Sequence, residues 1–138
     1  MALNSIVPRP DNPEKDPRVW MARAEGSLRL AAQAHVSGVL YEDLCFQCQQ
    51  AVEKALKAVH VHRDVPYRYT HNIDELVVGL ARRGISIPNP PVYVADLTRY
   101  ATETRYPGPY EPLSETDYKE AYAAAEFVVK WAREELQR

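Results

Sequence analysis

Apolar residues recur every three to four positions along most of the chain, which is the spacing of amphipathic helices. The clearest segment is 41–61, which contains no glycine or proline. Its predicted buried face consists of Leu44, Cys48, Ala51, Val52, Ala55, Leu56 and Val59. Similar stripes predict helices over residues 17–36, 72–83, 91–104 and 115–136, and no segment alternates as a strand does. The pattern therefore predicts an all-α bundle of three long and two shorter helices.

Turn and cap residues mark the helix ends. Asp16 followed by Pro17 is a typical helix start, and Gly84 suits the end of the third helix. Ser114 and Asp117 have the spacing of a capping box at the start of the last helix. Three prolines and few apolar anchors precede the first helix, so we expect residues 1–15 to form a mobile arm and residues 16–138 the folded domain.

Length and composition narrow the class of protein. The 138 residues, of which 46% are hydrophobic and 26% charged, fit one globular domain. No stretch has the roughly 18 apolar residues of a membrane span, and the N-terminus lacks the apolar core of a signal peptide. A net charge of −2 argues against bulk electrostatic binding of nucleic acid. We expect a cytoplasmic protein without membrane contact.

Cysteines and histidines are the first candidates for chemistry. Cys45 and Cys48 are too few for a disulfide framework and lack the second pair that a zinc site needs. His60, His62 and His71 fall on a helix end and a loop rather than on one helical face. We therefore predict no metal and no other cofactor, and we interpret the two cysteines as small buried side chains.

A dense polar band on the second predicted helix is open to two interpretations. It consists of Gln49, Gln50, Glu53, Lys54 and Lys57. Such a band is commonly a solvated helix face. Adjacent glutamines with interleaved lysines are also suited to binding a partner or a phosphate group.

The segment 105–110, Arg-Tyr-Pro-Gly-Pro-Tyr, is the most suggestive stretch. Arg105, held at a helix end by a proline-rich loop, presents the planar charged fork that recognises phosphate. Tyr106 and Tyr110 are suited to stacking on bases or to donating hydrogen bonds. The alternative is a rigid turn whose tyrosines pack between helices.

Three sequence blocks, in order, resemble the HEPN domain family (higher eukaryotes and prokaryotes nucleotide-binding). They are YEDLCFQCQQAVEKALKAV, YTHNIDELVVGLARRGI and YATETRYPG. The resemblance extends over about residues 19–136 and implies a five-helix, up-and-down bundle that forms a homodimer. It also implies a partner, a minimal nucleotidyltransferase, often in a toxin–antitoxin pair.

The resemblance further implies a candidate site. Many family members are metal-independent ribonucleases with an arginine followed after four to six residues by a histidine. Arg105 matches the arginine, but the expected histidine is absent, and Tyr110 stands in that region. Compared with a histidine, a tyrosine is a poor general base. His71 is therefore the other candidate base if the fold brings it close to Arg105.

Three hypotheses follow. The first is a homodimeric partner subunit of a small nucleotidyltransferase that binds nucleotide or RNA phosphate around Arg105, with Gln50, Lys54, Lys57 and Tyr106 as further binding residues. The second is an endoribonuclease toxin that uses Arg105 with Tyr110 or His71. The third is a purely structural helical bundle.

Overall fold

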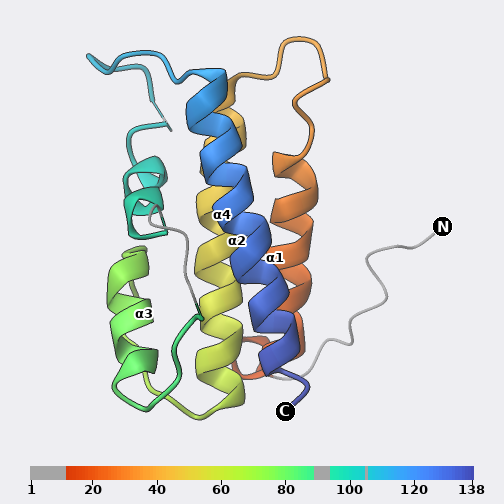
Figure 1. The fold of residues 1–138 in the computed structure, drawn as a ribbon, viewed down its shortest axis with the longest axis vertical. Coiled ribbons are helices and arrows are strands. Elements are labelled where there is room, and N and C mark those ends of the chain that lie inside the picture. The colour runs from red at the N-terminus through yellow and green to blue at the C-terminus, as the bar shows by residue number, and fades with distance from the viewer. Residues whose placement is uncertain (1–11, 89–93, 105) are drawn as a thin grey trace, which may run out of the picture.

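The computed structural model describes residues 12–88, 94–104 and 106–138, and these residues form an all-α bundle (Figure 1). The long helices are α1 (Pro17–Ala31), α2 (Tyr41–His62) and α4 (Glu115–Glu135). The shorter ones are α3 (Ile73–Ala81) and the 3-10 helix η3 (Ala95–Ala101), and a 3-10 turn, η2 (Pro13–Lys15), precedes α1. The described residues contain no strand, so the predicted fold class of three long and two shorter helices is confirmed.

Helix α1 runs antiparallel to α2 and α4, which run parallel to each other (Figure 1). Hydrogen bonds fix this arrangement. The Tyr118 hydroxyl at the start of α4 donates to the Ala31 carbonyl at the end of α1 at 2.8 Å. The Leu113 amide, just before α4, donates to Glu42 in the first turn of α2 at 2.9 Å. The α3–η3 segment therefore returns the chain to the end of the bundle at which α2 begins.

Several helix ends lie where their cap residues predict. The Asp16 carboxylate accepts from the Arg18 amide at 2.8 Å, and Ser114 and Asp117 form the predicted capping box. Gly84 follows α3 with a φ of +78°, a conformation that favours glycine. Two predictions were too long. Helix α1 ends at Ala31 rather than near residue 36, and the predicted helix over 91–104 is a short 3-10 helix whose first predicted residues lie outside the described ones.

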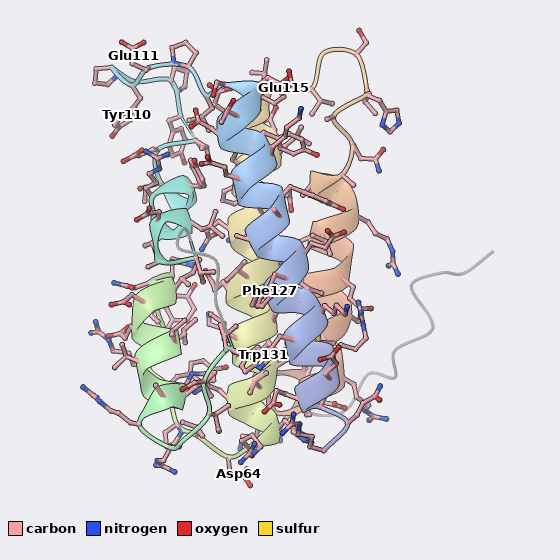
Figure 2. The ribbon with its side chains drawn as sticks, viewed as in Figure 1. Asp64, Tyr110, Glu111, Glu115, Phe127 and Trp131 are labelled. Atoms are coloured by element: carbon pink, nitrogen blue, oxygen red, sulfur yellow. The ribbon has the colours of Figure 1, made fainter. Side chains whose placement is uncertain are left out.

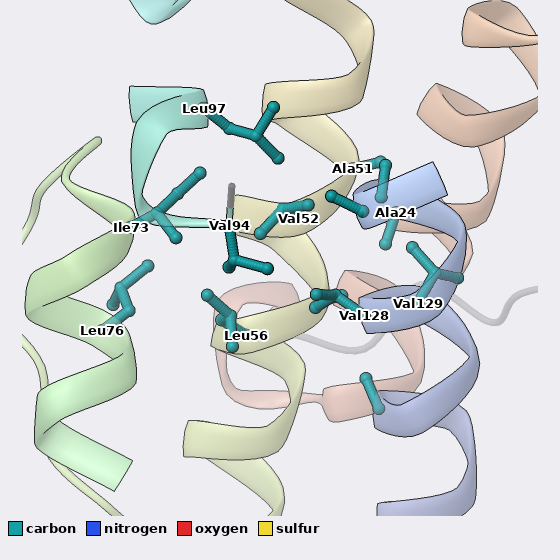
Figure 3. Close-up of a cluster of buried hydrophobic side chains, with 14 of the residues drawn as sticks. Ala24, Ala51, Val52, Leu56, Ile73, Leu76, Val94, Leu97, Val128 and Val129 are labelled. Atoms are coloured by element: carbon teal, nitrogen blue, oxygen red, sulfur yellow. The ribbon is translucent and has the colours of Figure 1, made fainter. Parts of the chain in front are cut away.

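The buried side chains of the core differ in size between its two parts. Nine of the buried side chains on α1, α2 and α4 are alanines, which are small enough for neighbouring helices to pack closely: Ala24, Ala31, Ala51, Ala55, Ala58, Ala121, Ala124, Ala125 and Ala132. Larger side chains, among them Leu56, Ile73, Leu76 and Leu97, fill the space between α2, α3 and η3 (Figure 3). The apolar face predicted for α2 is buried throughout.

Part of the predicted N-terminal arm packs on the bundle. Residues 1–11 lie outside the described ones, but residues 13–15 form η2, and the Trp20 indole donates to the Glu14 carbonyl at 2.9 Å. Among the described residues, no helix is both long and apolar enough to cross a membrane.

Candidate functional site

A cleft of about 780 Å³ lies at the end of the bundle where α2 and α4 begin. It is lined by the first turn of α2, by Arg99 of η3, by Glu103 and Thr104, by residues 106–113 and by Asp117 of α4. Figure 2 shows Tyr110, Glu111 and Glu115 at this end of the bundle, whereas Asp64 marks the opposite end. The cleft is large enough for a small ligand such as a nucleotide.

The cleft gathers part of the predicted site. Tyr106 and Tyr110 both line it and are exposed, at 73% and 56%. Arg105 lies outside the described residues, but its neighbours Thr104 and Tyr106 line the cleft. The Tyr110 ring lies close over Gly108, since a Cβ added to Gly108 would come within 3.0 Å of it. Glycine at this position therefore lets the loop fold back under the tyrosine.

Arg99 also lines this cleft, and it was not predicted from the sequence. Its guanidinium donates to the Tyr100 hydroxyl at 2.8 Å, which fixes the charged group at the lining. Burial raises the pKa of Tyr100, so that hydroxyl keeps its proton. A signal was present in the sequence, because the tripeptide Thr-Arg-Tyr occurs at both 98–100 and 104–106.

Carboxylates surround the arginine. Five line the cleft: Glu42, Asp43, Glu103, Glu111 and Asp117. Three of these accept hydrogen bonds from backbone amides, Glu42 from Leu113, Asp43 from Leu40 and Asp117 from Ser114. They thus hold the loop and the helix starts in place. Among the described lining residues these carboxylates outnumber Arg99, so attraction of an anion to the cleft would rest on that single arginine and not on a broad positive field.

The polar band predicted for α2 is not a solvated face. Gln49, Glu53 and Lys57 are all buried, and Lys57 donates to Glu53 at 2.9 Å. Packing of neighbouring segments over the helix accounts for this difference, because the Lys57 ammonium lies 5.4 Å from the ring centroid of Trp20 on α1 and 5.4 Å from that of Tyr69 in the α2–α3 loop. Lys57 is thus part of the interior.

Other predicted site residues lie beside this buried pair. Gln50 donates to Gln49 at 2.7 Å, and Lys54 donates to the Ser27 hydroxyl of α1 at 3.1 Å. His71 lies 2.9 Å from Glu53 through Nδ1. None of Gln50, Lys54 and His71 lines the cleft as described.

The two regions are separated along α2. Glu42 bonds to the cleft loop and Glu53 bonds to His71, eleven residues further on. At a rise of 1.5 Å per residue, that is about 16 Å along the helix axis. The structure thus divides the predicted site residues into a cleft group around Tyr106 and Tyr110 and a group around His71.

Cysteine and histidine chemistry is limited by burial. Cys45 and Cys48 are free and buried, and burial raises the pKa of Cys45 to about 12 and that of Cys48 further. His60 is buried with its two ring nitrogens 3.0 and 2.9 Å from the Val65 and Leu76 carbonyl oxygens. Within the described ranges, no three histidine, cysteine or acidic side chains are grouped so that they could hold a metal ion.

The fold and the cleft define a small helical-bundle domain with a cleft at one end. The HEPN domain model matches residues 17–136, and the chain belongs to this family. The structure is similar to a crystal structure of an archaeal HEPN homologue, with a TM-score of 0.66 and 28% sequence identity over 88% of this chain and 98% of that one. A comparison of the sequence with curated proteins finds no match. The family places this chain among helical domains related to nucleotides and RNA.

Proposed function

We propose that the protein is a homodimeric partner subunit of a small nucleotidyltransferase and binds nucleotide or RNA phosphate in the cleft around Arg105. The observation that carries this proposal is the cleft lining, which brings Arg99 and Thr104 together with two exposed tyrosines, Tyr106 and Tyr110. Arginine supplies a permanent charge and a planar fork for phosphate, and tyrosine supplies a ring for stacking on a base.

In a homodimer, the second copy would cover apolar side chains that are exposed at the cleft. Leu40, Tyr106 and Tyr110 are large apolar side chains, all exposed and all at the cleft. A second copy facing this cleft would cover them. Sedimentation of the wild type and of Leu40→Ser tests the point, with a dimer expected for the first and a weakened dimer for the second. A wild type that is monomeric at micromolar concentration contradicts it.

The nucleotidyltransferase partner is a separate element of the proposal. Co-expression with a minimal nucleotidyltransferase encoded beside this protein, followed by purification through a tag on one chain only, is expected to recover both chains. Recovery of the tagged chain alone contradicts the partner role and leaves phosphate binding to be tested independently.

Binding of a fluorescent single-stranded RNA and of AMP tests the cleft directly. We expect Arg99→Gln and Arg105→Gln each to weaken binding about 10-fold or more, which is the loss of a charge-assisted hydrogen bond. Arg83→Gln is the matched control, because Arg83 is an exposed arginine that follows α3 and lies outside the cleft. Equal binding by all four proteins contradicts the assignment, and no binding by the wild type favours a purely structural bundle.

Endoribonuclease activity is the alternative, and the cleft supplies one of its two candidate bases. Tyr110 lines the cleft, whereas His71 does not. Incubation of a mixed RNA pool in EDTA with wild type, Arg105→Gln and Tyr110→Phe tests this alternative. Cleavage that both variants abolish supports a metal-independent ribonuclease, and an uncut pool favours the partner subunit.

A further inference from the structure

The imidazole of His71 is held by a buried carboxylate and keeps one nitrogen toward the outside. Nδ1 lies 2.9 Å from Glu53 Oε1, and the His71 side chain is 50% exposed. Burial raises the pKa of Glu53, but hydrogen bonds from Lys57, Gln49 and His71 outweigh it and hold that pKa below its usual value. The charged carboxylate only accepts, so Nδ1 carries the proton that it shares with Glu53. Nε2 has no hydrogen-bond partner among the described residues.

Glu53 is fixed so firmly that it orients the imidazole. Oε1 accepts from Gln49 at 3.0 Å as well as from His71, and Oε2 accepts from Lys57 at 2.9 Å. Both Glu53 and Lys57 are almost completely buried. A buried ion pair stabilises a fold no better than packed apolar side chains do, so it is weak evidence of a purely structural role. A carboxylate behind a half-exposed imidazole is the arrangement that proteins use to orient a functional histidine.

An exposed aromatic ring lies next to this imidazole. Tyr69 is 85% exposed, and its ring meets that of His71 edge to face with centroids 5.6 Å apart. The Lys57 ammonium lies 5.4 Å from the Tyr69 centroid. An exposed ring beside an oriented hydrogen-bonding group is a platform on which a flat heterocycle can stack.

A positive charge without an acidic partner lies on the same stretch of α2. Lys54 donates to the Ser27 hydroxyl, and no carboxylate of the described residues forms a salt bridge with it. Burial lowers the pKa of Lys54, and repulsion from Arg23 lowers it further, while attraction to Glu53 opposes both effects. Lys54 directly follows Glu53 on α2. An anion bound here would relieve the repulsion between Lys54 and Arg23.

We propose that the His71 Nε2 atom, the Tyr69 ring and the Lys54 ammonium form a second ligand site, which takes a nucleoside phosphate. The phosphate contacts Lys54 and His71, and the base stacks on Tyr69. This site is separate from the end cleft, since its anchor Glu53 lies about 16 Å along α2 from Glu42. It does not depend on the function proposed for the cleft.

Titration of the full-length protein with AMP, with inorganic phosphate as the second probe, tests the site. Calorimetry gives the affinity, and a long-range ¹H–¹⁵N spectrum follows the ring nitrogens of His71. We expect AMP to shift the His71 Nε2 resonance and to bind at least 10-fold more tightly than phosphate, because only AMP has a ring for Tyr69. Equal affinities with no change in Tyr69→Leu would overturn the nucleoside part of the proposal.

His71→Asn is the decisive variant. The asparagine amide keeps a donor near the Nδ1 position for Glu53 and removes Nε2, so we expect unchanged thermal unfolding and about 10-fold weaker AMP binding at this site. His62→Asn is the matched control, because His62 ends α2, where its Nε2 lies 3.4 Å from the Arg138 carbonyl oxygen. Lys54→Gln is expected to weaken AMP and phosphate alike.

Arg105→Gln separates this site from the cleft. AMP binding that His71→Asn weakens and Arg105→Gln leaves intact supports the second site whatever happens at the cleft. AMP binding that only Arg105→Gln weakens, or an unchanged His71 resonance at saturating AMP, overturns it.

Discussion

Removal of one member of the buried Glu53–Lys57 pair is expected to destabilise the fold strongly. In Glu53→Met the Lys57 ammonium stays buried without its 2.9 Å partner, and in Lys57→Met the carboxylate loses that donor. Breaking a buried pair in this way costs about 3–5 kcal/mol in free energy of unfolding. For a domain of this size, that lowers Tm by roughly 10 °C or more.

The double variant separates the pair from the rest of the network. Glu53→Met/Lys57→Met removes both charges, so neither is left uncompensated. Two donors to Glu53 remain, however: the buried Gln49 amide and the half-exposed His71 ring. Water can reach His71, and the buried Gln49 amide keeps only its long 3.4 Å hydrogen bond to the His71 carbonyl, so we expect a residual cost no larger than the roughly 1–3 kcal/mol of one buried unsatisfied group. The double variant should therefore be less destabilised than the sum of the single ones.

Urea unfolding followed by circular dichroism measures all four proteins, and the m-value checks that unfolding exposes the same surface. Strictly additive free energies would refute the coupling between the two side chains. A single variant within about 1 kcal/mol of the wild type would refute their burial as a charged pair.

The same pair predicts a pH dependence. The pKa of Glu53 is lowered in the folded state, so the unfolded chain binds more protons between that value and the ordinary one near 4.5. The contribution of the Glu53 carboxylate to the free energy of unfolding is therefore fully present above about pH 4.5–5. It is lost as the pH falls through the pKa that Glu53 has in the folded state. Over this acid range the wild type should lose more stability than Glu53→Met does. Parallel curves for the two proteins contradict the lowered pKa.

Three other changes test the interior. Gly79→Ala places a Cβ 3.1 Å from the ring of His60, and two backbone carbonyls hold that ring in place. The cost of crowding should therefore exceed the gain in helix propensity, and urea unfolding should show a net loss of stability of about 1 kcal/mol. Leu56→Ala leaves a cavity at a fully buried position and should cost about 2–5 kcal/mol by the same measurement. Cys45 and Cys48, whose thiol pKa values are raised by burial, should resist iodoacetamide at pH 8 in the folded protein and react after unfolding.

Helix positions were predictable from sequence because periodicity and caps act locally. The ends of α2 and α4 lie within one or two residues of the predicted ones, and the start of α4 follows the Ser114 cap. The end of α1 was not predictable in this way. Its last carbonyl, that of Ala31, accepts from the hydroxyl of Tyr118, a residue 87 positions further along the chain. No local pattern contains that contact.

The buried charges show a second limit of pattern reading. Gln49, Glu53 and Lys57 recur every four residues, which is the spacing of a solvated stripe on a helix. Trp20 and Tyr69 cover this stripe from two different segments, and only the tertiary fold brings those segments over α2. Sequence did predict that Tyr106 and Tyr110 would share a loop. It did not predict Arg99, which comes to the same cleft because η3 ends there.

Two carboxylates of α2 do more to fix the positions of particular loops in this protein than the apolar stripe of the same helix does. An apolar stripe is satisfied by any bundle that covers it, whereas each of two carboxylates selects one particular loop. Glu42 accepts from the Leu113 amide and places the loop that lines the cleft, and Glu53 accepts from His71 and places the loop that bears Tyr69. The tyrosines of the cleft, Tyr106 and Tyr110, and the aromatic pair of Tyr69 and His71 lie on non-helical segments that the helices alone would not orient. One helix with acids three turns apart thus positions both regions, which would let so small a bundle hold the two ligand sites that we propose.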